Sequence, residues 1–353
     1  MRIHVTDLID GDQLSGDIFN HYGLHVLSKG TKLYTHEISR LLQHQIDFVD
    51  IDDRISQVDE TVGRTLESTV TPKWLPTVQP IYENAVKSFE GFFATALNSG
   101  AIDSNKVQDI VQPLLSNLQL ERDVVSMLLL LNTEDDYTYQ HSVQVGMLSY
   151  YLATWLGYSL ADASMIGKAG FLHDIGKCKI DESILNKPGK LSDEEFAEVK
   201  RHTEYGHAIL MTSFNDPKLA VGALQHHERM DGSGYPHGLV GDQIHPISKI
   251  IAVVDIYSAM ISARVYQKER DLLYVLKELH RLSFSQLDPT TTHTFIKHMI
   301  PNFIGKRVQL NNDEIGLIIM THPTEFFRPL VQIGEVFIDL TIERDYEIKH
   351  VYL

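Results

Sequence analysis

A scattered set of histidines and aspartates is the feature of this sequence with the clearest chemical potential. The chain has 18 histidines among 353 residues, and histidine is the commonest metal ligand in proteins. Five of the histidines and two aspartates stand in apolar or helical surroundings: His141, His173, Asp174, His202, His226, His227 and Asp255. Taken singly, each is explained at least as well by ordinary packing or a salt bridge. Together, within one helix-rich segment, they indicate a metal site.

Asp255 shows the physical problem most clearly. It follows the apolar run Ile250–Val254, so a helix at this point would bury its carboxylate. A buried carboxylate is costly unless it is protonated, paired or bound to a metal ion. A salt bridge to a core arginine or lysine is the alternative explanation, and it applies equally to Asp174.

Two adjacent pairs, His173-Asp174 and His226-His227, each follow an apolar run. Neighbouring residues on a helix point about 100° apart, so such a pair can share one site only if it flanks the site or lies at a helix end. Gly176 and Gly232 follow the two pairs, as expected where a chain leaves its helix. We therefore expect both pairs at helix ends.

This ordered pattern resembles the HD superfamily of metal-dependent phosphohydrolases. Two segments closely resemble the signatures of its HD-GYP subfamily: Leu172-His173-Asp174-Ile175-Gly176-Lys177 and His226-His227-Glu228-Arg229-Met230-Asp231-Gly232-Ser233-Gly234-Tyr235-Pro236. The stretch from Ile184 to Leu191, with Glu195 and His202, is also similar to that subfamily. The resemblance runs from about Asn132 to Leu310 and is far more specific than a lone His-Asp pair.

The resemblance implies an activity and a ligand set. HD-GYP proteins are phosphodiesterases of bacterial cyclic dinucleotides, chiefly cyclic di-GMP. In such a protein Asp174 would bridge two divalent ions, one completed by His141, His173 and Asp255 and the other by His202, His226 and His227. Mixed histidine and carboxylate ligation suits iron or manganese, with zinc as the alternative. Ions ~3.5–4 Å apart would hold the attacking and leaving oxygens, with a metal-bridging hydroxide as the nucleophile.

Further residues gain roles from the same resemblance. Lys177 would place its ammonium on a phosphate oxygen and act with Asp174 in catalysis. Arg264 matches a substrate-contacting arginine of the relatives. The loop Gly234-Tyr235-Pro236 would shape the substrate side of the site. Tyr235 would stack on a guanine or dock a partner, and plain loop packing explains it equally well.

Four positions depart from the family pattern. Some relatives hold a third metal with a glutamate one helical turn before the first histidine, and Tyr137 stands there instead, so we expect two metals. The family usually has aspartate at Ser258, proline at Val265 and tryptophan at Met230. These changes leave the predicted ligands intact, but they leave the exact nucleotide open.

Hydrolysis of cyclic di-GMP to linear pGpG, with GMP as an onward product left open, is the leading hypothesis. One alternative is a phosphodiesterase that prefers 3',3'-cyclic GMP-AMP, and another is a non-catalytic cyclic-dinucleotide receptor. A generic HD phosphohydrolase acting on mononucleotides or alarmones fits less well because of the Gly234-Tyr235-Pro236 loop. A homodimer and a partner protein with a diguanylate cyclase domain are further expectations left open.

The amino-acid composition limits which substrates and which cellular compartment we expect for this chemistry. The net charge of −16 argues against a basic surface for long nucleic acid, so an anionic substrate must be met locally by metal ions or a few placed cations. Cys178 is the single cysteine, which fits a reducing compartment. No apolar run approaches a membrane span or a signal peptide. We expect a cytoplasmic protein.

The elements that must position the site are mainly helical. We expect a mainly α fold: a helical HD-type phosphohydrolase core with a small α+β N-terminal unit and a short β-rich C-terminal segment. The expected division is 1–62 for the N-terminal unit, 63–131 for a connector (63–80) and helices, 132–300 for the catalytic domain and 301–353 for the strand-rich segment. The N-terminal unit should hold strands at 24–27 and 48–51 and a helix at 35–45. In the C-terminal segment we expect strands at 307–310, 315–320, 329–331 and 336–340, with a hairpin turn at 311–313.

Overall fold

The computed structural model describes residues 2–5, 8, 11–19, 25–34, 37, 41, 46, 48–52, 75–118, 137–261 and 272–352. The chain divides into two compact units, Met1–Val70 and Thr71–Leu353. The finer division at 62, 131 and 300 stays a prediction. The mainly helical fold class is confirmed, with helices from Leu75 to Met299 and a small antiparallel sheet after them.

The first unit contains two short antiparallel strand pairs. β1 (Arg2–His4) pairs with β4 (Phe48–Asp50), and β2 (Ile18–Phe19) pairs with β3 (His25–Leu27). They enclose a small apolar core: Val5, Leu14, Val26, Leu33, Leu41, Val49 and Ile51. The strands predicted at 24–27 and 48–51 are confirmed within a residue, while the helix predicted at 35–45 lies largely outside the described residues.

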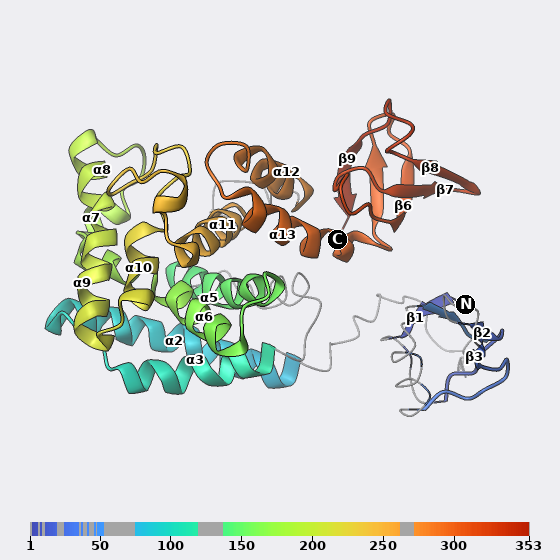
Figure 1. The fold of residues 1–353 in the computed structure, drawn as a ribbon, viewed down its shortest axis with the longest axis horizontal. Coiled ribbons are helices and arrows are strands. Elements are labelled where there is room, and N and C mark those ends of the chain that lie inside the picture. The colour runs from blue at the N-terminus through green and yellow to red at the C-terminus, as the bar shows by residue number, and fades with distance from the viewer. Residues whose placement is uncertain are drawn as a thin grey trace, which may run out of the picture. The chain divides into compact units, whose positions relative to one another are not determined.

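The second unit opens with α2 (Leu75–Ser99) and α3 (Ser104–Leu118), which lie side by side (Figure 1). The chain breaks between them after Ser99, and α2 begins inside the segment predicted as a connector. Pro76 lies in the first turn, where a helix needs no backbone N–H. Burial of one stripe of α2, including Val78, Tyr82 and Phe89, compensates for Pro80 within the helix.

α5 (Tyr137–Trp155) is the central helix of the unit. It packs against α2, α3, α6 (Leu160–Leu172), α11 (Pro246–Ile261) and α13 (Pro289–Met299). Its residues from Gln140 to Ala153 are all buried. Neighbouring helices therefore cover α5 on every side. His141 in its first turns therefore lies in the interior.

A run of short helices follows α6. η2 (Ile175–Lys179), α7 (Glu182–Leu185) and α8 (Asp193–Lys200) lead to α9 (His202–Phe214) and α10 (Pro217–Gln225). Ser192 caps α8 through a capping box with Glu195.

His202 does not continue the helix that Ser192 caps but begins the next helix, α9. The chain bends here because side chains take carbonyls near the end of α8. His202 Nδ1 donates to the Val199 carbonyl at 2.6 Å, and Thr203 Oγ1 donates to the Lys200 carbonyl at 2.9 Å. The bend points the ring of His202 away from the exposed surface of α8 and into the interior.

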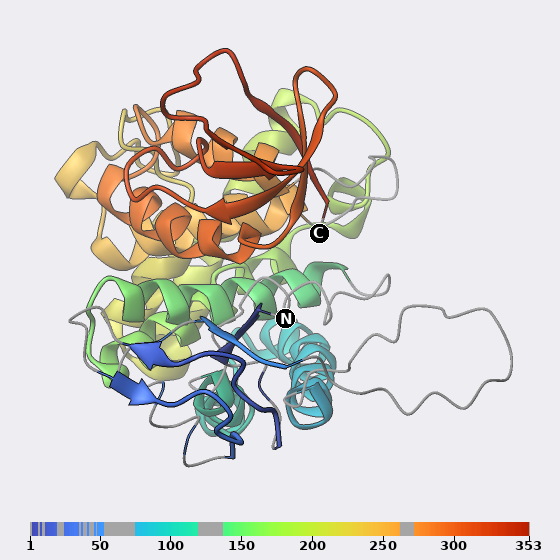
Figure 2. The same ribbon diagram turned by 90° about the vertical axis from the view of Figure 1, so that its right-hand side faces the viewer.

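The C-terminal strands form a five-stranded antiparallel sheet in the order β8-β7-β6-β5-β9 (red in Figure 2). Its strands are β5 (Arg307–Leu310), β6 (Ile315–Met320), β7 (Leu330–Ile333), β8 (Val336–Asp339) and β9 (Ile348–Tyr352). The four predicted strands are present, and the predicted hairpin turn has Asp313 at φ 68°. β9 was missed.

The buried side of the sheet joins the core of the helices. Val308, Ile318 and Val331 belong to the same apolar cluster as α5 and α11. On α12 (Leu272–Leu282), Lys277 Nζ donates to the carbonyl of Ile348 in β9 at 3.3 Å.

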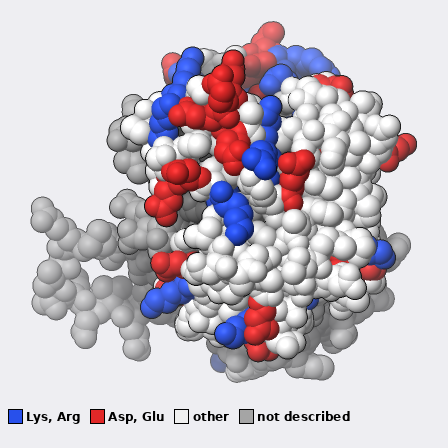
Figure 3. Space-filling model, turned by 90° about the vertical axis from the view of Figure 1, so that its left-hand side faces the viewer, with Lys and Arg blue, Asp and Glu red and all other residues white. Residues whose placement is uncertain are grey.

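The surface and the helix lengths add two observations. On the face that α7, α8 and α9 present, acidic and basic side chains are intermingled rather than gathered into a basic surface (Figure 3). Among the described helices, none combines the length and the apolar character needed to cross a bilayer.

Candidate metal centre

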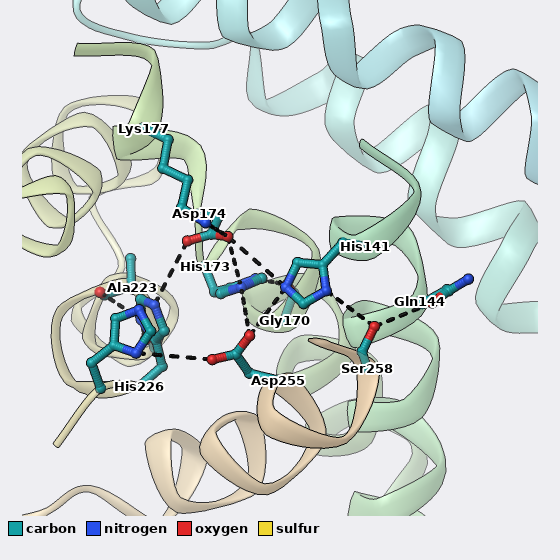
Figure 4. Close-up of polar contacts among 12 residues, drawn as sticks. His141, Gln144, Gly170, His173, Asp174, Lys177, Ala223, His226, Asp255 and Ser258 are labelled. Atoms are coloured by element: carbon teal, nitrogen blue, oxygen red, sulfur yellow. Dashed lines mark hydrogen bonds and ion pairs between the residues drawn. The ribbon is translucent and has the colours of Figure 1, made fainter. Parts of the chain in front are cut away.

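The structure brings the seven predicted residues together from five helices. They lie at the start of α5 and α9, at the C-terminal ends of α6 and α10, and within α11 (Figure 4). Two sets have ligand atoms that all lie within 4.8 Å of one another: Asp174, His202, His226 and His227, and His141, His173 and Asp174. Both pairs of adjacent residues follow the last residue of a helix, as the sequence predicted.

Asp174 belongs to both sets, and each of its two carboxylate oxygens faces one of them. Oδ1 lies 3.4 Å from Nε2 of His202 and 3.8 Å from Nε2 of His226. Oδ2 lies 3.2 Å from Nε2 of His173 and 4.0 Å from Nε2 of His141. Each carboxylate oxygen therefore faces a different pair of imidazoles.

Asp255 contacts both sets. Its Oδ1 lies 3.0 Å from His141 Nε2 and 3.8 Å from His173 Nε2, and its Oδ2 lies 3.9 Å from His227 Nδ1. The carboxylate that the sequence placed in an apolar helix is thus partnered by imidazoles. Among the described residues, no lysine or arginine forms an ion pair with Asp255, which disfavours the salt-bridge alternative for this residue.

Backbone carbonyls fix three of the rings. Nδ1 of His173 donates to the Gly170 carbonyl at 2.8 Å, and Nδ1 of His226 donates to the Ala223 carbonyl at 2.9 Å. Nδ1 of His202 donates to the Val199 carbonyl at 2.6 Å. A carbonyl oxygen only accepts, so the proton sits on Nδ1 and Nε2 of a neutral ring presents a lone pair.

His141 is held differently. Its Nδ1 lies 3.1 Å from Oγ of Ser258 on α11, and that hydroxyl lies 3.1 Å from Oε1 of Gln144 (Figure 4). The sequence had flagged Ser258 only as a departure from the family. It gave no hint of this contact because 117 residues separate Ser258 from His141.

Burial and neighbouring charges keep the histidine rings and the carboxylates in the protonation states that bind metal. Burial, reinforced by neighbouring imidazoles, lowers the pKa of His226 well below its ordinary value, and burial lowers the pKa of His227 to about 3. Burial also lowers the pKa of His202. These rings are neutral at pH 7, and neutral imidazole is the ligand form.

The carboxylates stay ionised despite their burial. Burial opposes ionisation of Asp174, but the nearby charges of His173 and Lys177 outweigh it and hold the pKa of Asp174 well below its ordinary value. The hydrogen bond and charge of His141 do the same for the pKa of Asp255. Burial alone would lower the pKa of His173, but the charge of Asp174 raises it, so Nε2 of His173 suits a proton or a cation.

A divalent ion fits the centre on the chemistry of these atoms. Nε2 of His202 and Nε2 of His226 lie 3.4 Å apart and both face Asp174 Oδ1, so three acceptors converge without a proton between them. Asp174 Oδ1 is buried and has no hydrogen-bond partner within the described part of the chain. An unpaired buried polar group costs ~1–3 kcal/mol. A cation bound between the three acceptors removes that cost.

Gly176 sets the distance between η2 and α9. A Cβ at this position would lie 2.0 Å from the carbonyl oxygen of His202 and 2.4 Å from the backbone nitrogen of Gly206. A side chain is therefore incompatible with the observed packing. The glycine lets the segment that carries Asp174 approach the first turn of α9, where His202 lies.

The loop after α10 packs on the metal centre through Tyr235. The ring of Tyr235 lies 4.7 Å from that of His227, and its backbone nitrogen donates to the His227 carbonyl at 3.2 Å. A Cβ on Gly234 would lie 2.5 Å from the same carbonyl oxygen. The Tyr235-Pro236 peptide bond is cis. Within the protein, Tyr235 thus covers a predicted ligand.

Glu228 holds this loop closed, and the sequence analysis gave it no role. Its side chain is buried, and the carboxylate accepts from the backbone nitrogens of His237 at 2.7 Å and Leu239 at 2.9 Å. A glutamate beside two candidate ligands and before a glycine-rich loop was the available signal. Its loop partners become visible only in the fold.

Of the two charged residues predicted to contact the substrate, the structure describes Lys177 but not Arg264. Lys177 lies at the site, where Nζ donates to Asp174 Oδ2 at 2.6 Å, and its side chain is 28% exposed. Arg264 and Val265 lie outside the described residues. Tyr137 begins α5 one turn before His141, and the described structure includes its backbone only.

Comparison with known proteins places this geometry in a family. The family model described as HD domain matches residues 124–291. The seven clustered residues all lie in that range. They therefore lie within a segment that matches the HD domain.

The curated relatives of this chain are named after two different substrates. The cyclic di-GMP phosphodiesterase PA4108 of Pseudomonas aeruginosa is 34% identical over 242 residues, covering 68% of this chain and 58% of the relative. A cyclic di-GMP phosphodiesterase of Thermotoga maritima is 40% identical over 186 residues, covering 51% and 50%. The 3'3'-cGAMP-specific phosphodiesterase 1 of Vibrio cholerae is 34% identical over 189 residues, covering 53% and 42%. The chain therefore spans about half the length of these relatives.

Among solved structures, Bd1817, an HDG"Y"P protein from Bdellovibrio bacteriovorus, is similar in fold. The TM-score is 0.50 at 15% identity, over 84% of this chain and 97% of Bd1817. At that identity the likeness concerns the fold alone.

Proposed function

We propose that this protein is a metal-dependent phosphodiesterase that hydrolyses cyclic di-GMP to linear pGpG, with GMP as an onward product. The observation that carries the proposal is the convergence of three acceptors, Asp174 Oδ1 and Nε2 of His202 and His226, in a buried site. Hydrogen bonding among these groups does not satisfy them, whereas a divalent cation does. The names of the relatives support the cyclic dinucleotide as the substrate class.

Two ions complete the proposed centre. Asp174 would bridge them, because its oxygens face different imidazoles; His141, His173 and Asp255 would hold one ion, and His202, His226 and His227 would hold the other. The mixed nitrogen and oxygen donors favour iron or manganese, with zinc as the alternative. When bound, such ions activate water and neutralise the charge that develops on a phosphodiester.

The chain's own groups bind and orient the phosphate. Lys177 carries an ammonium beside Asp174 Oδ2, and its partial exposure allows the same ammonium to reach a phosphate oxygen at the mouth of the site. Two carboxylates against two divalent ions and Lys177 leave the centre locally positive. An acidic chain can therefore hold an anionic substrate at this point.

Tyr235 contributes a neutral hydroxyl and an aromatic surface. Burial and the carboxylates of Asp174 and Asp255 raise the pKa of Tyr235 above its ordinary value, so the phenol keeps its proton and can donate. Its ring covers His227, and we assign it first to holding that imidazole. Gly234 and Pro236 flank it and shape this side of the pocket, and Arg264 is proposed as a further substrate contact.

A preference for 3',3'-cyclic GMP-AMP is the second candidate, because relatives with that name match the same region. A cytoplasmic location, action beside a diguanylate cyclase domain protein, and a homodimer complete the proposal. The single cysteine, Cys178, fits the reducing compartment.

The test is anaerobic purification, metal analysis, and product identification on both cyclic dinucleotides. We expect two ions per chain, cleavage of cyclic di-GMP, and loss of activity in His173→Ala. Ser248→Ala, a buried serine on α11 that bonds the Val221 carbonyl at 3.0 Å, is the matched control and should retain activity. Tight nucleotide binding without turnover under iron, manganese and zinc would establish the receptor alternative instead.

A further inference from the structure

Two aromatic rings lie in sequence beside the metal centre. Tyr235 covers His227, with the ring centroids 4.7 Å apart. Phe196 of α8 lies next to Tyr235, with 6.3 Å between the ring centroids and 79° between the ring planes. Phe196 is 46% exposed, so a ligand can reach its ring from solvent. The two nearly perpendicular rings of Phe196 and Tyr235 form what we call the aromatic corner.

The ammonium of Lys200 lies over both rings of the aromatic corner. Its Nζ is 5.0 Å from the ring centroid of Phe196 and 5.9 Å from that of Tyr235. The neighbouring cation, Arg201, is paired with Glu198 at 3.0 Å. Lys200 forms no ion pair and no side-chain hydrogen bond within the described part of the chain. Its three donors are therefore available to an acceptor on a ligand.

Packing of the protein core does not account for these side chains. No residue of α8 is buried, so Phe196 is not part of an apolar face that the helix must cover. A single exposed aromatic residue carries no functional meaning by itself. Here the exposed ring adjoins a second ring, an unpaired ammonium and the candidate metal centre, and this combination points to a ligand.

The corner matches a face and an edge of guanine. Every nucleic-acid base has a flat face that stacks on aromatic rings. Guanine presents two adjacent acceptors, O6 and N7, whereas adenine presents N7 beside an amino donor. A lysine ammonium only donates, so it favours guanine. Because the stem of Lys200 is flexible, its ammonium can turn from the rings to the edge of a base in the corner.

We propose that Phe196, Tyr235 and Lys200 form a guanine subsite, in which the base stacks in the aromatic corner and Lys200 donates to O6 and N7. The proposal rests on the proposed function, because the subsite holds one base of a cyclic dinucleotide whose phosphodiester lies at the metal centre. A sugar separates base from phosphate in a nucleotide, and Tyr235 likewise separates Phe196 from His227. Phe196 and Lys200 are thus specificity-determining residues, and the sequence analysis gave neither a role.

The subsite has a consequence for a substrate with two different bases. 3',3'-cyclic GMP-AMP has one guanine, one adenine and two phosphodiester bonds that are not equivalent. With guanine held in the corner, the same phosphodiester lies at the metal centre each time. Water gives its hydroxyl to that phosphorus and a proton to the 3' oxygen that leaves. One linear product, pGpA or pApG, should therefore form in excess.

The first test measures binding without turnover. Hydrolysis-resistant phosphorothioate analogues of cyclic di-GMP and cyclic di-AMP are titrated by calorimetry into the full chain with Mn²⁺. Wild type should bind the guanine analogue about 10-fold more tightly, within the range for a lysine contact to O6 and N7. Lys200→Met should weaken the guanine analogue alone and abolish the preference. Lys200→Arg, whose guanidinium also donates to O6 and N7, should restore it.

Phe196→Ala separates stacking from base discrimination. Stacking tolerates any base, so this variant should weaken both analogues roughly 10-fold and keep the preference for guanine. Phe284→Ala removes a phenylalanine that is 76% exposed beyond α12, and Lys297→Met removes an exposed cation from α13. These two matched controls should bind both analogues as wild type does.

The second test identifies the products from 3',3'-cyclic GMP-AMP. Wild type should release one of the two linear dinucleotides in excess, and Lys200→Met should release both in similar amounts. A residue that only supports the fold would change the rate and leave the product ratio unaltered. A wild-type ratio near one, or a ratio that Lys200→Met leaves unchanged, overturns the subsite.

The outcomes distinguish the two proposals. Wild type that binds neither analogue, or both equally, refutes the guanine subsite, and so does Lys200→Met with the wild-type preference. Phe196→Ala with wild-type affinities removes Phe196 from it. A guanine preference that Lys200→Met abolishes, in a protein that hydrolyses no cyclic dinucleotide, refutes the phosphodiesterase and leaves the subsite standing.

Discussion

The two halves of the His–Asp centre differ in how their polar atoms are paired when no ion is bound. The His202 half comprises His202, His226, His227 and Asp174 Oδ1, and the His141 half comprises His141, His173, Asp255 and Asp174 Oδ2. In the His202 half, carbonyls lock the rings of His202 and His226, and lone pairs converge on Asp174 Oδ1 with no proton among them. In the His141 half, His141 bonds Asp255 at 3.0 Å and Lys177 bonds Asp174 Oδ2 at 2.6 Å. In the first half no donor lies among the converging acceptors, whereas in the second only Nε2 of His173 lacks a hydrogen-bond partner among the described residues.

This difference predicts an order of binding. An ion entering the His202 half displaces no hydrogen bond, because its acceptors already point inward. An ion entering the His141 half must displace both Lys177 from Asp174 and the proton between His141 and Asp255. We therefore expect the first ion in the His202 half, bound more tightly than the second. The following predictions test that asymmetry.

Asp174→Asn should have the largest effect, because this residue serves both halves. The amide lacks the charge that balances two cations, so we expect both ions to be lost. The fall in affinity should exceed the 10–100-fold typical of changes to outer partners of a metal ligand. Metal content after dialysis measures this. Glu204→Gln, on the exposed side of α9, is the control; retention of two ions in Asp174→Asn would remove Asp174 from the bridging role.

Single histidine variants should separate the halves. His141→Ala should keep one tightly bound ion, because the His202 half is intact. His226→Ala should lose the tight ion and keep only weak binding. Both should lose phosphodiesterase activity, so Zn²⁺ titration of each variant is the informative measurement. Equal residual affinities in the two variants would contradict the asymmetry.

Glu228→Gln should loosen the loop that places Tyr235 over His227 in the His202 half. The neutral amide has one acceptor oxygen for the two backbone nitrogens of His237 and Leu239, so at least one charge-assisted bond is lost. Such bonds contribute ~1.5–3 kcal/mol each. We expect a lower free energy of unfolding and faster proteolytic cleavage within 229–239. Glu335→Gln in an exposed turn is the matched control, and identical cleavage rates would show that Glu228 does not hold the loop.

The metal-free protein should lose stability in mild acid. The pKa of His227 falls to about 3 on folding, and the pKa values of His202 and His226 fall as well, so the unfolded chain binds protons first. Stability conferred by such a ring is full above the ordinary pKa near 6.5 and is lost as pH falls through that value toward 3.

The slope is ~1.4 kcal/mol per pH unit for each such ring. His173, whose pKa is raised, changes stability only above the ordinary histidine pKa and so does not act in this acid window. Denaturant unfolding between pH 8 and 4 measures it in wild type and in His227→Asn. The variant should show a shallower fall, and parallel curves would show that His227 is not the source.

The sequence predicted the parts of this centre that depend on local pattern. A histidine-aspartate pair after an apolar run and before Gly176 belongs at a helix end, and Asp255 in an apolar helix needs a partner. Both expectations hold in the fold. The ligand roles, the metal count inferred from Tyr137 and the nucleotide preference stay predictions.

What the sequence did not predict depends on contacts across the chain. The bend before His202 arises from side chains that compete for carbonyls, and helical periodicity carries no sign of that competition. The bond from Ser258 to His141 and the two bonds of Glu228 depend on how α5, α11 and the loop pack. β9 was missed because a short strand gains its stability from β5 beside it.

Gly176 sets a distance in the centre, between η2 and α9, that does not depend on the predicted ligand side chains. The carbonyl of His202 would lie 2.0 Å from a Cβ at this position, so bare main chain meets main chain between η2 and α9. The spacing between the segment that carries Asp174 and the first turn of α9 is therefore fixed by backbone contact rather than by side-chain choice. Side chains elsewhere in the site can change what the site binds without altering this spacing.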